Sequence, residues 1–120
     1  MIILRSQKLR NAILECKIRI SSILMKPDIV RFKIGKTVDP IKKRYNETEE
    51  YKKDYDDIIS IYETQDKALV DSLEKCLIHD YRMTYPIKCK NKQEGSGPDC
   101  ADSENETARI YIVVKYNNQV

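Results

Sequence analysis

The sequence predicts a small α/β domain of the α+β type, with a mostly antiparallel three-stranded central sheet flanked by helices and an extra C-terminal strand. Three observations predict this class. Short β-branched runs recur along the chain, two stretches between them carry the apolar period of a helix, and 120 residues suffice for one folded domain. We therefore assign residues 1–120 to one domain, with a core at about 15–85, a loop at about 86–107 and a strand at 108–116.

The composition narrows the class of protein. With 41% hydrophobic and 34% charged residues and no long apolar run, the chain is neither membrane-spanning nor largely disordered. The opening MIILRSQKLR places basic residues after its apolar patch, which is the reverse of a secretory signal. We therefore expect an intracellular protein, in the cytoplasm or nucleus, without a membrane partner.

Charge is distributed unevenly along the chain. Residues 1–53 hold 14 Lys or Arg against 6 Asp or Glu, a net +8, whereas residues 54–120 hold 8 against 13, a net −5. A basic half of this size favours a polyanionic partner, although such charge is also found on ordinary solvated surface. The charge alone therefore makes a nucleic acid one candidate for this partner.

Two consecutive strands are predicted near the start of the core. Residues 15–24 (ECKIRISSIL) predict the first strand, because isoleucines alternate with basic residues in its middle. Pro27 and the aspartate after it indicate a turn. Residues 29–35 (IVRFKIG) predict the second strand, which ends at Gly35. Together the two strands predict a hairpin.

A helix is predicted to follow, running to about residue 55. Asp39 can cap it, and Pro40 fits its first position, where no amide donor is needed. The apolar side of this helix is predicted to hold Ile41, Tyr45, Thr48, Tyr51 and Tyr55. Arg44 falls inside the same arc. An arginine there reaches an anion, pairs with a carboxylate or extends along the surface to water.

The third strand and the second helix have clear signals. Residues 56–64 (DDIISIYET) predict a strand, and Thr64 or Asp66 can cap the helix that follows over about 65–83. One helix face is predicted to hold Leu69, Val70, Leu73, Cys76, Leu77 and Tyr81. Glu74 falls at the margin of this face. We therefore expect its carboxylate to be partly shielded from water.

The strand-to-helix junction after Gly35 predicts a phosphate-binding surface. Basic side chains and the free amides of a helix start both attract phosphate. The predicted nucleic-acid contacts are Lys36, Lys42, Lys43, Lys52 and Lys53.

Two segments together carry a family resemblance. KIGKTVDPIKKR at residues 33–44 is followed about thirty residues later by ALVDSLEKCLIHDY. This pair resembles the GIY-YIG nuclease superfamily, whose second strand ends in a Tyr/Lys-Ile/Val-Gly triplet and leads into a helix carrying an arginine. A later helix of that family carries a glutamate in a Glu-x-x-Leu-Ile context, matched here from Glu74 to Ile78. The resemblance covers roughly residues 15–82.

The resemblance implies a divalent-metal-dependent endonuclease that hydrolyses DNA phosphodiester bonds. Glu74 would hold Mg²⁺ or Mn²⁺, Arg44 would steady the scissile phosphate, and Lys33 occupies the place of the tyrosine in the second motif. The first motif of the family supplies a tyrosine from its first strand, and residues 15–24 contain none. A late asparagine of the family corresponds to Asn91 or Asn105.

Two alternatives stay open. A catalytically inactive nucleic-acid-binding module on the same fold would keep the basic surface without the chemistry. The cysteines allow a zinc-stabilised interaction domain, because Cys76 and His79 lie three apart on one predicted helix and Cys89 and Cys100 could complete four ligands. In an intracellular protein a buried free thiol is the commoner state of a cysteine on an apolar helix face.

Overall fold

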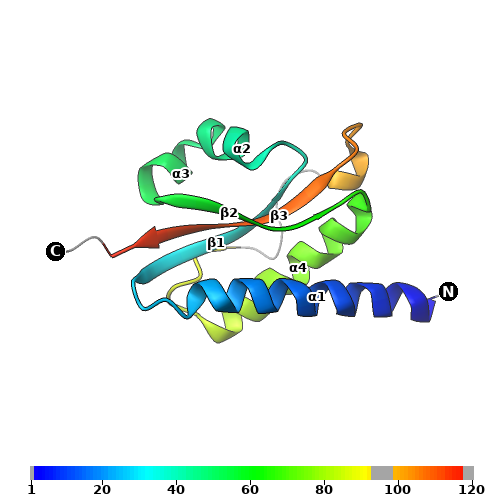
Figure 1. The fold of residues 1–120 in the computed structure, drawn as a ribbon, viewed down its shortest axis with the longest axis horizontal. Helices are drawn as coiled ribbons and strands as arrows, with labels where there is room; N and C mark the ends of the chain where they lie inside the picture. The colour runs from blue at the N-terminus through cyan, green and yellow to red at the C-terminus, as the bar shows by residue number, and fades with distance from the viewer. Residues whose placement is uncertain (1, 93–98, 118–120) are drawn as a thin grey trace.

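The structure of this protein is a computed structural model that describes residues 2–92 and 99–117, with side chains from residue 7 onward (Figure 1). In chain order the elements are α1 (Ile2–Leu24), β1 (Ile29–Thr37), α2 (Ile41–Glu47), α3 (Glu49–Asp54), β2 (Asp57–Thr64), α4 (Lys67–Thr84), the short 3-10 helix η1 (Cys100–Asp102) and β3 (Ala108–Tyr116). No helix in these ranges combines the length and the apolar character that crossing a membrane requires.

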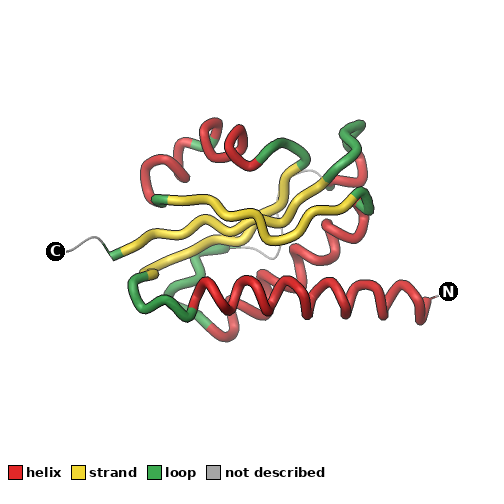
Figure 2. Tube along the Cα trace, in the orientation of Figure 1, coloured by secondary structure: helices red, strands yellow, loops and turns green. Residues whose placement is uncertain are grey.

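The predicted fold class is confirmed. β1, β3 and β2 lie side by side in that order, and both pairings are antiparallel. Figure 2 shows the strands as one layer, with α2 and α3 over one face and α1 and α4 over the other. The strand predicted as a C-terminal addition is present as β3 and is the central strand of the sheet.

The sequence of β3 explains its central position. Ile110, Ile112 and Val114 pack into the core formed with α1 and α4, whereas Tyr111 and Val113 pack on the other face against α2 and α3. Side chains of a strand alternate between faces, so a strand that is apolar at every position must be covered on both sides. RIYIVVKY satisfies this condition and therefore lies in the middle of the sheet.

The predicted strand at residues 15–24 is wrong, because this segment belongs to α1. The alternation of isoleucines covers only a few residues, whereas a longer stretch shows helical spacing. Among the residues of α1 whose side chains are described, the buried ones are Ala12, Cys16, Ile20 and Leu24, each four residues after the last. Ile18 is 71% exposed. The predicted hairpin is therefore wrong as well, and the turn at Pro27 joins a helix to a strand.

The helix predicted to begin at Asp39 and Pro40 is two short helices. α2 begins at Ile41 after Pro40, with no capping side chain, so the predicted cap by Asp39 is wrong. At Thr48 the backbone is extended, and the Thr48 hydroxyl donates a 2.7 Å hydrogen bond to the Arg44 carbonyl. This β-branched residue separates α2 from α3, and the chain turns there to keep its tyrosines against the sheet.

The elements predicted around α4 are confirmed. β2 covers the predicted third strand almost completely. Asp66 caps α4, and its Oδ1 accepts a 3.1 Å hydrogen bond from the Leu69 amide.

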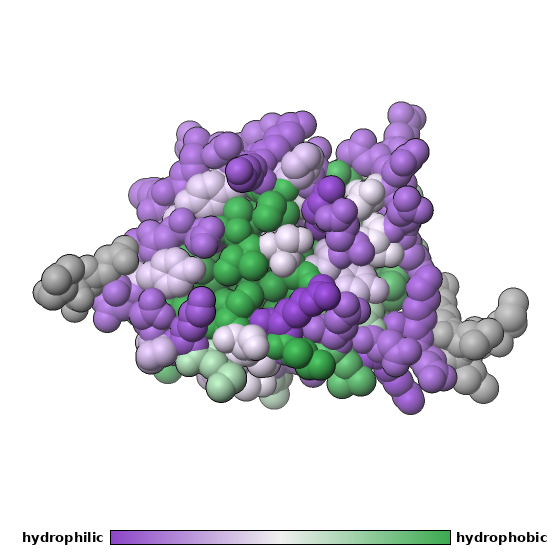
Figure 3. Space-filling view, viewed as in Figure 1, coloured by the Kyte–Doolittle hydropathy of each residue, from purple (hydrophilic) through white to green (hydrophobic). Residues whose placement is uncertain are grey.

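The edge of the sheet formed by β2 is partly apolar. Figure 3 shows apolar side chains gathered between α2 and α1 over this strand, and Ile58 and Ile59 of β2 are only partly buried.

Candidate active site

Gly35 lies inside β1, directly opposite Tyr111 of the central strand. A Cβ atom at this position would overlap the Oη and Cζ atoms of Tyr111 and would lie 2.9 Å from its Cε1. Only glycine therefore leaves room for the tyrosine ring on the side of the sheet covered by α2 and α3.

The prediction that the strand ends at Gly35 is wrong, because β1 continues to Thr37.

Arg44 joins this tyrosine from α2. Its Nε atom donates a 3.2 Å hydrogen bond to Tyr111 Oη, and its guanidinium lies 5.9 Å from the centre of the Tyr51 ring. The hydroxyls of Tyr51 and Tyr111 are 2.6 Å apart. Burial alone would lower the pKa of Arg44, but its contacts with the two tyrosines outweigh burial and raise it. We call Arg44, Tyr51 and Tyr111 the tyrosine cluster.

Lys36, the next residue of β1, points to the opposite side of the sheet, toward α4. Its side chain is 6% exposed, and its Nζ donates a 3.0 Å hydrogen bond to Asp71 Oδ1. Asp71 is fixed by the amides of Cys100, at 2.7 Å, and Ala101, at 3.1 Å. Burial would raise the pKa of Asp71, but these hydrogen bonds lower it. The predicted nucleic-acid contact Lys36 thus lies in a buried ion pair.

Glu74 lies one turn beyond Asp71 on α4 and is 4% exposed. Its Oε1 atom is 3.7 Å from Lys36 Nζ, which is too long for a hydrogen bond, and it has no hydrogen-bond partner within the described ranges. Burial raises the pKa of Glu74 to about 7, although the charge of Lys36 opposes the rise. We call Lys36, Asp71 and Glu74 the carboxylate cluster.

The three residues predicted to be catalytic surround one strand. Lys33 and Arg44 lie on the side of β1 that faces α2 and α3, and Glu74 lies on the side that faces α4. Lys33 is 22% exposed and its Nζ pairs with Glu50 Oε1 at 2.8 Å. The charge of Arg44, on the other side of the sheet, also lowers the pKa of Glu74, but it is the smallest of the causes that act on this group. The two clusters meet at the consecutive residues Gly35 and Lys36.

Of the two candidate asparagines, Asn91 lies beside β1. Its amide group accepts a 2.9 Å hydrogen bond from the Ile34 amide and donates a 2.8 Å hydrogen bond to the Ile34 carbonyl. The side chain therefore completes the backbone pairing of the strand just before Gly35. Asn105 is exposed and donates to the Val38 carbonyl at 3.3 Å.

The structure does not bring the four candidate zinc ligands together. Cys76 and His79 lie on α4, Cys89 pairs along β1 through a bridge to Phe32, and Cys100 belongs to η1. Within residues 2–92 and 99–117 there is no group of three or more His, Cys, Asp or Glu side chains that could hold a metal ion. A site at Glu74 would therefore rest on one carboxylate.

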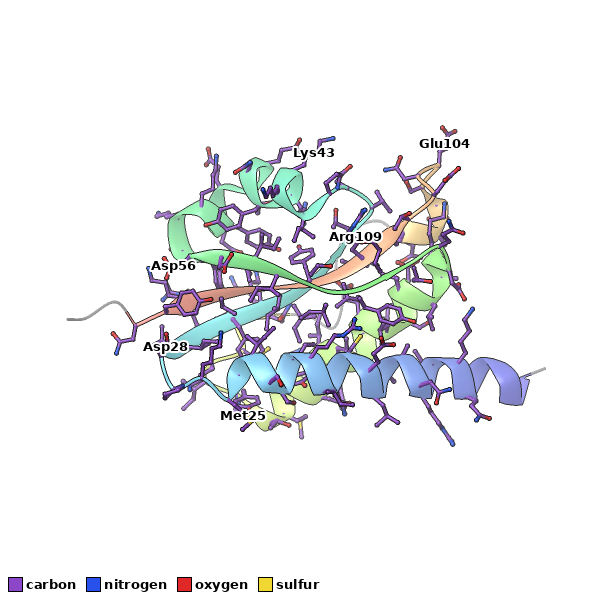
Figure 4. The ribbon with its side chains drawn as sticks, in the orientation of Figure 1. Met25, Asp28, Lys43, Asp56, Glu104 and Arg109 are labelled. Atoms are coloured by element: carbon purple, nitrogen blue, oxygen red, sulfur yellow. The ribbon has the colours of Figure 1, made fainter. Side chains whose placement is uncertain are left out.

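The other predicted nucleic-acid contacts lie on the surface. Lys42, Lys43, Lys52 and Lys53 are all exposed. Figure 4 shows Lys43 on the outer side of α2, and its Nζ lies between Asp39, at 3.6 Å, and Glu47, at 3.9 Å.

Two residues of the site were missed by the sequence analysis. Tyr111 is distant in sequence from Arg44. The sequence feature that could have indicated it is a tyrosine, with its polar hydroxyl, inside a strand that is otherwise apolar on both faces. Asp71 precedes Glu74 by three residues, and this spacing alone places both carboxylates on neighbouring positions of one helix.

Comparison with known proteins gives no further assignment. No family model matches the sequence, and neither a curated protein nor a solved structure matches the chain.

Proposed function

We propose that this protein is a divalent-metal-dependent endonuclease of the GIY-YIG type that hydrolyses DNA. The observation that carries the proposal is the state of Glu74, a buried carboxylate with one oxygen that lacks a hydrogen-bond partner in the described part of the chain. An oxygen left unsatisfied in this way destabilises a fold, and a bound ion is one of the few reasons for which native proteins keep one. Glu74 is also the glutamate at which the resemblance places the metal.

The residues fit a hard divalent cation. Carboxylate oxygen is the ligand that Mg²⁺ and Mn²⁺ prefer, and Mg²⁺ is commonly held by one or two carboxylates while keeping several waters. Glu74 would hold the ion, and Asp71 is too fully hydrogen-bonded to add a ligand. When bound, the ion would supply positive charge to the phosphate and to the leaving oxygen.

Arg44 is suited to orient the phosphate. A guanidinium has five N–H donors, and Tyr111 uses only the one on Nε. This bond and the Tyr51 ring fix the plane of the group, so the remaining donors can meet phosphate oxygens without a large loss of side-chain freedom. Lys33, at the place of the second-motif tyrosine, adds a further cation on the same side of β1.

Tyr111 is our candidate for the tyrosine that residues 15–24 lack. It comes from the other end of the chain, but it lies on the strand that pairs with the KIG segment, opposite Gly35. Its Oη accepts the Arg44 hydrogen bond and lies 2.6 Å from the Tyr51 hydroxyl, so Tyr111 would hold the Arg44 guanidinium in position beside the phosphate. The tyrosine and the KIG segment would thus come from strands that are hydrogen-bonded to each other in the sheet, β3 and β1, although these strands do not follow one another along the chain.

A nucleic-acid-binding module without catalysis is the second candidate, and Lys36 favours it. The Lys36 ammonium already supplies a positive charge 3.7 Å from Glu74. In that case the carboxylate cluster would be structural, and the basic side chains alone would bind DNA.

Plasmid nicking by the purified chain tests the proposal. We expect cleavage with Mg²⁺ or Mn²⁺, none with a chelator, and a roughly thousandfold lower rate for Glu74→Gln, because losing the ion removes several kcal/mol of transition-state stabilisation. Glu104→Gln is the matched control, since Figure 4 shows Glu104 on the loop before β3. A parent protein that binds DNA but cleaves under neither ion supports the binding module instead.

A further inference from the structure

We propose that the outer edge of β1, together with residues 85–92, binds the phosphates of the nucleic-acid strand. This inference rests on the proposed function for the identity of its ligand. It assigns a binding role to Arg31, Lys90 and Lys92, which lie outside the two clusters, and it predicts where the strand runs relative to Gly35.

The charges of this edge are all of one sign. Residues 29–37 contain three basic residues and no acidic one, but Lys36 points away into the carboxylate cluster and Lys33 is paired with Glu50. Residues 85–92 also contain three basic residues and no acidic one. By contrast, residues 41–54, which form α2 and α3, hold five basic and four acidic residues. A polyanion is attracted by charge that neighbouring carboxylates do not neutralise, so the β1 edge exceeds the α2 surface as a phosphate-binding region.

The edge is a rigid platform. The Phe32 amide donates to the Lys88 carbonyl and the Lys90 amide donates to the Phe32 carbonyl, both at 2.9 Å. Asn91 then occupies both backbone groups of Ile34. These bonds fill this part of the edge, so it cannot pair with an added strand of a protein partner. A ligand must be recognised here through side chains.

Those side chains line a pocket of about 320 Å³. Its walls are Arg31, Lys33, Glu50, Asp54, Tyr55, Lys90 and Lys92, which together carry four positive and two negative charges. The negative charge of Glu50 is paired with Lys33. Lys90 and Lys92 are exposed, and neither has an ion pair among the described residues. The pocket therefore has an excess of positive charge for an anion to neutralise.

Arg31 is held in this pocket by uncharged groups and has no ion pair among the described residues. Its Nε and a terminal nitrogen donate to the backbone carbonyl of Asp54, at 3.2 and 2.9 Å, and its guanidinium lies 5.7 Å from the centre of the Tyr55 ring. A carbonyl and an aromatic ring position the group but carry no net charge. The guanidinium is thus pre-ordered for a phosphate.

The pocket and the candidate active site lie along the same strand. Lys33 is two residues from Gly35, and two residues of a strand span about 7 Å. This is the axial length of about two nucleotides of one strand. A strand with a phosphate in the pocket would therefore bring a nearby phosphate toward Arg44.

Oligonucleotide binding by two double variants of the full chain tests this inference. Fluorescence anisotropy is measured with a labelled duplex in EDTA over a series of salt concentrations, so that cleavage does not interfere. Lys90→Gln with Lys92→Gln should reduce the slope of log affinity against log salt by about 2 and weaken binding at least tenfold at low salt. The matched control, Lys42→Gln with Lys43→Gln, should change both quantities by less than half as much, because Lys43 is offset by Asp39 and Glu47.

The outcomes separate this inference from the proposed function. An equal or larger effect of the α2 variant, or unchanged binding by the Lys90 and Lys92 variant, overturns the edge as the phosphate path even if metal-dependent cleavage is found. Absence of cleavage overturns the nuclease and leaves the binding result in place. Inorganic phosphate at millimolar concentration should not displace the duplex. Displacement would identify a free phosphate as the ligand and contradict the inference.

Discussion

The two polar clusters on either side of β1 are built from adjacent residues of the strand but differ in how completely they are satisfied. In the tyrosine cluster, Arg44, Tyr51 and Tyr111 use one another's hydrogen-bonding groups. In the carboxylate cluster, Asp71 has three hydrogen bonds, whereas Glu74 Oε1 has none within the described residues. The first arrangement is closed and can position groups. The second leaves one buried carboxylate oxygen without a hydrogen bond, and we call it open for this reason; our proposal assigns that oxygen to a metal ion.

This difference indicates which residues should tolerate change. A closed network loses stability when one member is removed, because the remaining partners stay buried without a bond. An open carboxylate already destabilises the fold, so its neutralisation should be harmless to folding and harmful only to the ligand. The following predictions test that contrast.

The largest effect expected on stability is the pH dependence that Glu74 introduces. Its pKa rises from 4.5 to about 7 on folding, so between these values the folded protein holds a proton that the unfolded chain has lost. The stability from this group is present below pH 4.5 and declines up to about pH 7, by about 3 kcal/mol at most. Glu74→Gln should lack this decline.

Urea unfolding of both proteins at pH 5 and pH 8 measures this difference. The other charged groups around Glu74, namely Lys36, Asp71 and Arg44, are present in both proteins and so cancel in the comparison. We expect Glu74→Gln to gain about 2.5 kcal/mol on the parent between the two pH values. Parallel changes in the two proteins would show that Glu74 is not desolvated.

Removal of the Tyr111 hydroxyl should affect catalysis without affecting the metal. Tyr111→Phe takes away the acceptor of Arg44 and the partner of Tyr51, so it should slow cleavage about a hundredfold and lower stability by about 1–2 kcal/mol. Mn²⁺ affinity should be unchanged. Tyr62→Phe, a partly buried tyrosine of β2, is the control. If Tyr111→Phe cleaves DNA at the parent rate, the Tyr111 hydroxyl has no role in the reaction.

The last of these predictions concerns the packing that joins β1 to β3. Gly35→Ala places a methyl group against the Tyr111 ring and should destabilise the fold by about 1–3 kcal/mol. In a Tyr111→Val background the same change should be nearly neutral, because the ring that it meets is gone. Thermal unfolding of the parent, Gly35→Ala, Tyr111→Val and the double variant measures the coupling free energy between the two positions. If Gly35→Ala lowers stability equally in both backgrounds, the added methyl group does not clash with the Tyr111 ring.

The sequence predicted the parts of the fold that have a local cause. Asp66 caps α4 through its own side chain, and the β-branched residues of β2 and β3 form strands as expected. The error at residues 15–24 came from a short window, in which Ile18 and Ile20 suggested alternation. From Ala12 to Leu24 the buried residues recur every four positions, and Ile18 faces outward.

The site was predictable only in part for a related reason. Arg44 and Glu74 are marked by their positions on helices, because a charged residue on or beside an apolar face needs a partner. Tyr111 joins them through the order of the strands, which places the last strand of the chain between the first two. No local pattern fixes that order. The burial of Lys36 likewise depends on η1, which anchors Asp71 from a distant part of the chain.

Mn²⁺ binding tests the central claim most directly, because it requires neither DNA nor turnover. The parent, Glu74→Gln and Glu104→Gln are titrated with Mn²⁺ at pH 8, where Glu74 is ionised, and bound ion is followed by water proton relaxation. We predict one ion per chain for the parent and for Glu104→Gln, and loss of that site in Glu74→Gln. Parent-like binding by a folded Glu74→Gln, or no binding by the parent, would contradict the assignment of Glu74 as the metal ligand.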